Sequence, residues 1–136
     1  MLPLMKRIGI LIVDDSARMR DALKVLLQSF TRVDVAGTAG DGHEALEQVR
    51  LLKPDVVLMD IRMPRKNGLE ATKAIKALPH PPKVIVVSAD DGQTHRAAAA
   101  AAGADAFCSK FLIASDLLPA ILSLFPADAK RTPPPG

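Results

Sequence analysis

The stretch from Pro54 to Gly68, PDVVLMDIRMPRKNG, constrains the fold of this chain more than any other. From Asp55 to Met59 it is short, mostly apolar and partly β-branched, which is typical of a strand buried on both faces of a parallel sheet. The run ends at Asp60, after which Met63-Pro64 and Asn67-Gly68 break the strand and turn the chain. Asp60 is therefore expected at the carboxyl edge of a sheet, where open α/β sheets bind their ligands.

Length and composition bound the class of protein. A chain of 136 residues is long enough for one domain with its own core, and 49% hydrophobic but 3% aromatic residues predict an aliphatic core. The single cysteine, Cys108, has no partner for an internal disulfide, so we expect a buried thiol in a reducing compartment. No apolar segment is long enough for a signal peptide or a membrane helix, which predicts a cytoplasmic protein without membrane contact. The net charge of +3, spread along the chain, does not indicate nucleic-acid binding.

Strand and helix patterns alternate five times along the chain, which predicts an α/β domain with a parallel sheet and helices on both faces. Strands are expected at residues 8–13, 33–36, 55–59, 83–88 and 106–109. Helices are expected over 16–30, after the capping residues Asp41 and Asn67, around Ala97 to Ala102 before Gly103, and from about 115 to 125. We interpret Gly37, Gly40 and Gly42 as turn residues, and we expect Pro119 near the first turn of the last helix.

Polar side chains follow four of the predicted strands: Asp14 and Asp15, Asp60, Ser88, and Lys110. Because parallel strands share one direction, these side chains are expected at one edge of the sheet. Three crowded carboxylates repel one another unless a cation lies among them, and hard oxygen ligands suit Mg²⁺. The lysine and the hydroxyl could bind phosphoryl oxygens. The residues thus predict a site that holds a phosphoryl group against a carboxylate; the alternative is a set of unrelated surface side chains.

Four motifs, in order, resemble those of the receiver domain of bacterial two-component response regulators over roughly residues 6–125. They are LIVDDS, VVLMDIRMPRKNG, VIVVSAD and GADAFCSKF. The resemblance implies a flavodoxin-like, doubly wound, five-stranded parallel sheet of order 2-1-3-4-5. It also implies a signalling switch rather than an enzyme, one that assists its own phosphorylation and dephosphorylation.

The resemblance implies roles for named residues. Asp60 would accept a phosphoryl group from a histidine kinase or a phosphotransfer protein, and Lys110 and Ser88 would bind the phosphoryl oxygens. Mg²⁺ would be held by Asp14, Asp15, Asp60 and the backbone carbonyl of Arg62. Ser88 and Phe107 would act as switch residues, and Arg62 and Asp90 would tune the lifetime of the phosphoryl group, as an ion pair over it or independently. The last two helices and the fifth strand would form the interaction face.

Two positions depart from many receivers. Phe111 follows the lysine where many have proline, and Phe107 stands at an aromatic position that is often tyrosine. Phe107 is equally compatible with a switching ring and with a ring that stays in the core. The three histidines (His43, His80 and His95) form no metal or phosphotransfer pattern and are interpreted as surface residues.

The output of the switch has two interpretations. The closeness of the Asp60 stretch to receivers that carry a helix-turn-helix output domain favours a receiver whose output domain is missing from this chain. The alternative is a stand-alone receiver that contacts a downstream effector protein; a homodimer formed on phosphorylation is compatible with both. Residues 126–136 are rich in proline and are expected to be a disordered tail.

Two enzymatic interpretations fail on particular residues. A dinucleotide-binding enzyme would need glycines after the first strand, where this chain has DDSARM, and an aspartyl phosphatase would need an acid at Arg62.

Overall fold

Strands and helices alternate throughout this computed structural model, which describes residues 7–61, 67–90 and 92–125. The strands are β1 (Ile8–Val13), β2 (Val33–Ala39), β3 (Val56–Asp60), β4 (Lys83–Ser88) and β5 (Ala106–Ser109). The helices are α1 (Ala17–Gln28), α2 (Gly42–Leu52), α3 (Gly68–Lys76), α4 (Gln93–Ala101) and α5 (Ile113–Ser123), with a short 3-10 turn, η1 (Lys110–Leu112), between β5 and α5.

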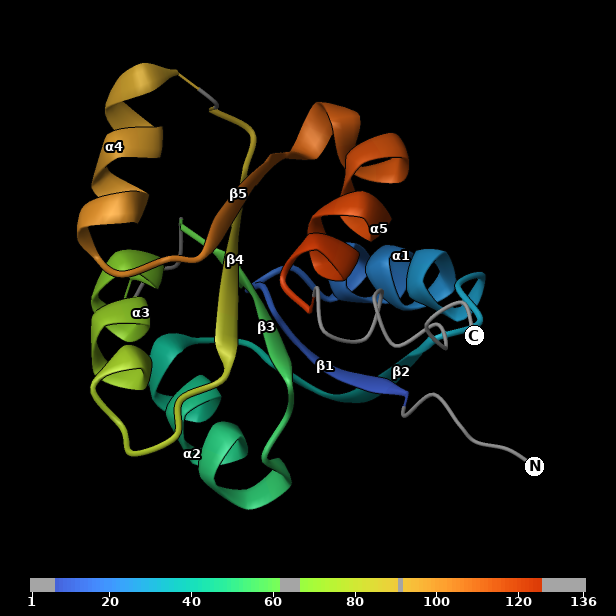
Figure 1. Ribbon diagram of the computed structural model, residues 1–136, viewed down its shortest axis with the longest axis horizontal. Coiled ribbons are helices and arrows are strands. Elements are labelled where there is room, and N and C mark those ends of the chain that lie inside the picture. Colours follow the sequence, from blue (N-terminus) through green and yellow to red (C-terminus); the bar gives the residue numbers. More distant parts are fainter. Residues whose placement is uncertain (1–6, 62–66, 91, 126–136) are drawn as a thin grey trace, which may run out of the picture.

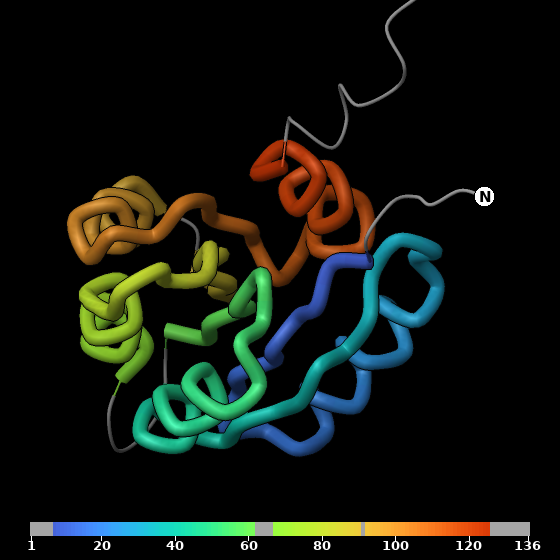
Figure 2. The backbone as a smooth tube through the Cα atoms, turned by 60° about the horizontal axis from the view of Figure 1, so that its bottom comes forward, coloured from blue at the N-terminus to red at the C-terminus, as the bar shows by residue number. Residues whose placement is uncertain are grey.

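The five strands form one parallel sheet in the order β2-β1-β3-β4-β5. Helices α2, α3 and α4 cover one face and α1 and α5 the other, so the molecule has three layers (Figures 1 and 2). This is the flavodoxin-like order, and the predicted fold class is confirmed. All five strands run the same way, so their carboxyl ends share one edge.

Side chains of successive residues in a strand point to opposite faces of the sheet. The interior strands therefore contribute to two separate hydrophobic cores. In β1, Leu11 and Val13 face the core formed with α2, α3 and α4, which we name the first core. Ile10 and Ile12 face the core formed with α1 and α5, which we name the second core. Cys108 is buried in the second core, as predicted. Both faces of β1, β3 and β4 are covered, which explains their nearly continuous apolar sequences.

The second strand extends three residues beyond its predicted end. β2 continues to Ala39, and its pairing with β1 skips one residue between Val35 and Gly37. Gly37 is therefore a strand residue rather than a turn residue. A Cβ atom there would lie 2.6 Å from a methyl carbon of Leu52, so a side chain at this position would have to displace the end of the Leu52 side chain.

Two helices begin earlier than the sequence predicts. α4 begins at Gln93 because a polar first turn precedes the alanines, and it ends before Gly103, whose φ of 99° fits the predicted terminating glycine. α5 begins at Ile113, directly after η1, so Pro119 lies inside the helix rather than in its first turn. Proline leaves the carbonyl of Ser115 without its helical donor; Ser115 and Pro119 are both exposed, so water can replace that hydrogen bond.

Some sequence predictions concern residues outside the described part of the chain. These are the Pro-rich segment 126–136 and Arg62, so the domain limits at residues 6 and 125, the disordered tail and the roles of Arg62 stay predictions. Among the described residues, no helix combines the length and the apolar character needed to span a membrane.

Candidate functional site

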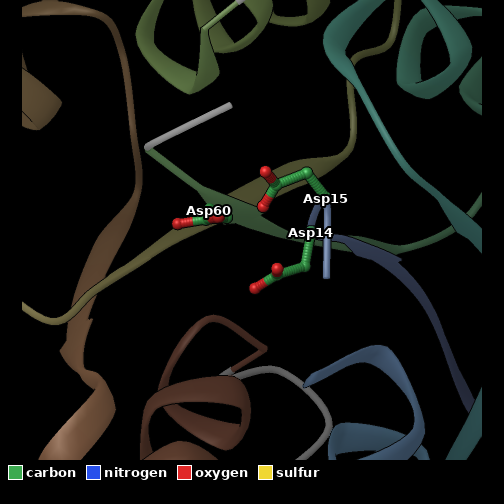
Figure 3. Close-up of side chains that lie close together, drawn as sticks. All are labelled: Asp14, Asp15 and Asp60. Carbon is green, nitrogen blue, oxygen red and sulfur yellow. The ribbon is translucent and has the colours of Figure 1, made fainter. Parts of the chain in front are cut away.

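Three carboxylates gather at the carboxyl edge of the sheet. Asp14 and Asp15 follow β1, and Asp60 ends the adjacent strand β3, whose Met59 pairs with Val13. One carboxylate oxygen from each aspartate lies within 4.8 Å of the others, and the side chains project into a common space (Figure 3). Asp14 and Asp60 are buried, with 2% and 5% of their surface exposed, whereas Asp15 is exposed. The predicted convergence of these residues is thus observed.

Hydrogen bonds fix Asp14 against the start of α1. Its Oδ1 accepts a hydrogen bond from the backbone N–H of Ser16 at 2.9 Å, and its backbone carbonyl accepts one from Arg20 Nη1 at 2.6 Å. Ser16 in turn caps α1, because its hydroxyl oxygen accepts from the N–H of Met19. The cap that starts the helix therefore also orients one carboxylate of the cluster.

Lys110 brings a positive charge between the two buried carboxylates. Its ammonium lies 3.4 Å from Asp14 Oδ2 and 3.5 Å from Asp60 Oδ1. The position of Lys110 follows from the end of β5, where the hydroxyl oxygen of Ser109 accepts from the N–H of Phe111 and starts η1. The Lys110–Phe111 peptide bond is trans. Within this group of four side chains the carboxylates outnumber the ammonium by two, so the group favours a further cation.

Ser88 ends β4 one residue beyond Val87, the pairing partner of Asp60, and is buried. Its hydroxyl oxygen accepts from the N–H of Asp90 at 3.1 Å, so Ser88 also shapes the loop between β4 and α4. The four predicted strand ends thus lie at one edge of the sheet.

Asp90 has one partner at the start of α4 and one just before it. Its Oδ1 accepts from the N–H of Gly92, and its Oδ2 lies 3.4 Å from Nδ1 of His95. Sequence reasoning treated His95 as an unrelated surface residue, because its five-residue spacing from Asp90 across a helix start is no known signature. The proposed pairing of Asp90 with Arg62 concerns a residue outside the described part and stays a prediction.

Phe107 is half-buried and packs against the first core. The guanidinium carbon of Arg96, on α4, lies 4.6 Å from the centre of its ring, a distance that allows a cation–π contact. The ring is therefore a point of contact between β5 and α4. Whether it changes rotamer stays a prediction.

The donor set fits Mg²⁺. Mg²⁺ prefers a small number of carboxylate oxygens and keeps coordination positions for water and phosphate oxygens. Asp14, Asp15 and Asp60 supply such oxygens at one place, and the exposed Asp15 leaves the group open to solvent. Among the described residues, no sulfur or imidazole ligand contributes to this group, which makes softer metals less suitable.

The sequence profile of the response regulator receiver domain matches residues 10–122. The chain belongs to this family of receiver domains. This family consists of the receiver domains of two-component systems. Binding of Mg²⁺ at an acidic pocket is a general feature of the family.

Curated relatives of the receiver have more than one output. A protein-glutamate methylesterase/protein-glutamine glutaminase from Pyrococcus horikoshii is 47% identical over 89 residues, which are 65% of this chain and 24% of that protein. The transcriptional regulatory protein LnrK from Bacillus subtilis is 38% identical over 117 residues, 86% of this chain and 53% of LnrK. The chain thus spans about a quarter to a half of these relatives. Sequence analysis did not consider a methylesterase output.

Solved receiver structures have the same fold. The response regulator domain of Thermotoga maritima CheB superposes with a TM-score of 0.80 at 40% identity, covering 87% of this chain and 96% of that one. CheY from a Borrelia burgdorferi complex with CheX, beryllofluoride and magnesium gives a TM-score of 0.81 at 28% identity, covering 88% and 90% of the two chains.

Proposed function

We propose that the receiver is a phosphorylation-dependent signalling switch in which Asp60 accepts a phosphoryl group from a histidine kinase or a phosphotransfer protein. The observation that carries the proposal is the position of Lys110, whose ammonium lies 3.4–3.5 Å from one oxygen each of Asp14 and Asp60. A buried carboxylate at a ligand-binding edge, with a cation beside it, suits a group that adds negative charge.

The transfer step is a displacement at phosphorus. A carboxylate oxygen of Asp60 forms a bond to the phosphorus of a phosphohistidine while the phosphorus–nitrogen bond breaks, and the imidazole nitrogen keeps the electron pair and takes up a proton. Lys110 offsets the charge of the phosphoryl oxygens, and the Ser88 hydroxyl donates a hydrogen bond to one of them. Mg²⁺, bound by Asp14, Asp15, Asp60 and the carbonyl of Arg62, would supply further positive charge. In dephosphorylation, water attacks the phosphorus and the Asp60 carboxylate leaves.

The signal would travel through the strands that end at the site. A phosphoryl group on Asp60 attracts Lys110 and Ser88, which end β5 and β4. β5 also carries Phe107, whose ring lies against the first core and below Arg96 of α4. We therefore assign α4, β5 and α5 as the interaction face of the switch.

The phosphoacceptor can be tested by labelling with acetyl phosphate in the presence of Mg²⁺, followed by mass spectrometry of acid-quenched protein. Wild type and Asp34→Asn should gain one phosphoryl group, and Asp60→Asn should gain none. Asp34 is the control because it is an exposed carboxylate on β2, paired with Arg7. Labelling of Asp60→Asn at the wild-type level would remove Asp60 as acceptor.

The interaction face can be tested by amide hydrogen exchange with and without beryllofluoride, which occupies the place of a phosphoryl group. We expect changed exchange in α4, β5 and α5 as well as around Asp60. Changes confined to the loop after Asp60 would contradict the proposed face while leaving the acceptor intact.

For the output, we propose that the receiver regulates either an output domain of the same protein or a separate effector. Two outputs occur among the relatives, protein-glutamate methylesterase/glutaminase and transcriptional regulation. Sequence analysis favoured a DNA-binding output, and the methylesterase relatives add a second candidate. Measuring ester hydrolysis and DNA binding of the complete gene product, with and without acetyl phosphate, distinguishes these outputs from a stand-alone receiver, which would show neither.

A further inference from the structure

A groove of about 640 Å³ opens at the amino edge of the sheet, opposite the Asp60 site. It is bounded by the end of α2, the segments before β3 and β4, and Phe125 after α5. The edge is assigned from Asp55 and Lys83, which lie at the starts of β3 and β4, whereas Asp60 and Ser88 end those strands. We call this feature the amino-edge groove. Its volume is in the range of typical ligand pockets.

The backbone of the groove is strained and rigid. Lys53 and His80, with φ of 49° and 53°, are the non-glycine residues with left-handed backbone in the described part of the chain, and both line the groove. Such conformations are costly for ordinary residues and are often retained where they serve a function. His80 is also flanked by prolines on both sides, which fix the φ angles of this wall. A rigid wall loses little conformational entropy when it binds a partner.

The rim of the groove is positively charged. Arg50, Lys53 and Lys83 line it, and none of them forms an ion pair with a carboxylate of the described residues. Asp55 is the acidic residue of the lining, and its Oδ2 accepts a hydrogen bond from the N–H of Gly9 at 2.8 Å. The rim therefore attracts anionic groups.

The interior of the groove is apolar. Val49, Leu78, Phe125 and the neighbouring prolines provide its walls. An occupant with both negative charge and a bulky apolar group would complement this combination.

The two ends of this chain do not have that chemistry. Residues 1–7 contain Lys6 and Arg7 without an acid, and residues 126–136 contain Lys130 and Arg131 with one acid, Asp128. Both ends are therefore basic, like the rim of the groove. We propose that the amino-edge groove docks an acidic segment of another protein, which inserts a bulky apolar side chain between the cations of the rim. The Asp60 site lies at the opposite ends of the strands, so the docked segment does not contact a phosphoryl group on Asp60.

Fluorescence anisotropy with labelled hexapeptides tests the proposal. The probe Glu-Glu-Phe-Leu-Glu-Glu should bind, and its affinity should fall with rising salt. The charge-inverted peptide Lys-Lys-Phe-Leu-Lys-Lys and the anchorless peptide Glu-Glu-Ser-Gly-Glu-Glu should bind at least tenfold more weakly. Arg50→Gln, Lys53→Gln and Lys83→Gln should each lower the affinity about two- to fivefold, as expected for exposed charge pairs. Lys24→Gln, on α1, is the matched control and should leave the affinity unchanged.

A further measurement locates the binding. In ¹⁵N-labelled protein, the peptide should shift the amide signals of Val49, Lys53 and Lys83 rather than those of Asp60 and Ser88. Equal binding of the three peptides, equal affinity of the Lys24 and rim variants, shifts at the Asp60 edge, or self-association that the peptide blocks would each overturn the proposal. None of these outcomes bears on phosphorylation of Asp60.

Discussion

Gly68 lies against the backbone of Asp60 so closely that no side chain fits between them. A Cβ atom on Gly68 would overlap the carbonyl oxygen of Asp60 and would lie 2.7 Å from the Cα atom of Ile61. The N–H of Gly68 donates to the carbonyl of Ile61 at 2.9 Å, and the buried hydroxyl of Thr72 donates to the carbonyl of Gly68. The start of α3 thus fixes the end of the strand that carries Asp60.

Gly68→Ala should therefore weaken both the fold and the site. The obstructing atoms belong to the backbone, so we expect the free energy of unfolding to fall by about 1–3 kcal/mol, as in overpacked cores. Phosphorylation by acetyl phosphate should slow as well, because Asp60 must shift. Urea unfolding and labelling rates measure the two effects. Gly9→Ala is the control, because its Cβ would meet no atom closer than 3.6 Å; equal effects of the two substitutions would contradict the argument.

Mg²⁺ should stabilise the receiver through Asp15 in particular. A ligand that binds the native state at a hundred times its dissociation constant adds about 2.7 kcal/mol to the free energy of unfolding. Asp15 is exposed, so Asp15→Asn should fold normally but lose most of this gain. Urea unfolding with MgCl₂, and then with EDTA in excess, measures it. Asp34→Asn should respond like wild type, and a full response of Asp15→Asn would exclude Asp15 as a ligand.

Cys108 should contribute a pH-dependent part of the stability. Burial, and then the negative charge of Asp116, raise the pKa of its thiol, whereas Arg96 acts in the opposite direction. The unfolded chain then loses this proton first as the pH rises, so the contribution is complete at neutral pH and declines above about pH 8.5. The difference in unfolding free energy between wild type and Cys108→Ala should shrink between pH 7.5 and about pH 10. A difference that grows over this range would reverse the sign of the prediction.

Lys53→Gly should stabilise the fold and lower the affinity of the amino-edge groove for the acidic peptide. Lys53 caps α2 with left-handed backbone, a position at which glycine is normally favoured. Relief of this strain should raise the free energy of unfolding by about 1 kcal/mol. Lys24→Gly, inside α1, should lower it by a similar amount. If Lys53→Gly is no more stable than wild type, the left-handed backbone carries no cost.

The loop between β4 and α4 should control the lifetime of the phosphoryl group. Asp90→Ala is expected to speed dephosphorylation if Asp90 shields the phosphorus with Arg62. Because His95 lies 3.4 Å from Asp90, it competes for the same carboxylate, and His95→Ala should slow the decay. Decay rates of the phosphorylated variants measure this, with Arg62→Ala/Asp90→Ala as the double mutant. Additive effects of Arg62 and Asp90, or faster decay of His95→Ala, would contradict the prediction.

The side chains of the site could be placed at one edge of the sheet from the sequence, because that placement depends only on the parallel direction of the strands. Four apolar runs end in Asp14, Asp60, Ser88 and Lys110, and parallel pairing brings such ends together. The sheet order came from the resemblance to receivers rather than from the apolar runs, which do not specify which strands are neighbours. The motifs thus predicted the order of the strands, and the strand patterns predicted which side chains lie at the site.

Other features depend on contacts that no local pattern encodes. Gly37 resembles a turn glycine, and only its pairing with Leu11 of β1 shows that it lies in a strand. The proximity of His95 to Asp90 depends on the path of a loop, and the interior position of Pro119 depends on the start of α5 directly after η1. The amino-edge groove was missed for the same reason, since its lining comes from three separated segments.

The interior position of β1, between β2 and β3, has a consequence for how the chain folds. On one side β1 pairs with β2, which is close in sequence. On its other side it pairs with β3, where Ile10 pairs with Val56, and β3 is synthesised much later. Contacts across such separations make folding slower than in helical bundles of the same size, which fold in microseconds to milliseconds. During synthesis, one edge of β1 therefore stays unpaired until residues near Asp60 have left the ribosome. Aggregation in this interval is the hazard of a sheet whose first strand lies in its interior.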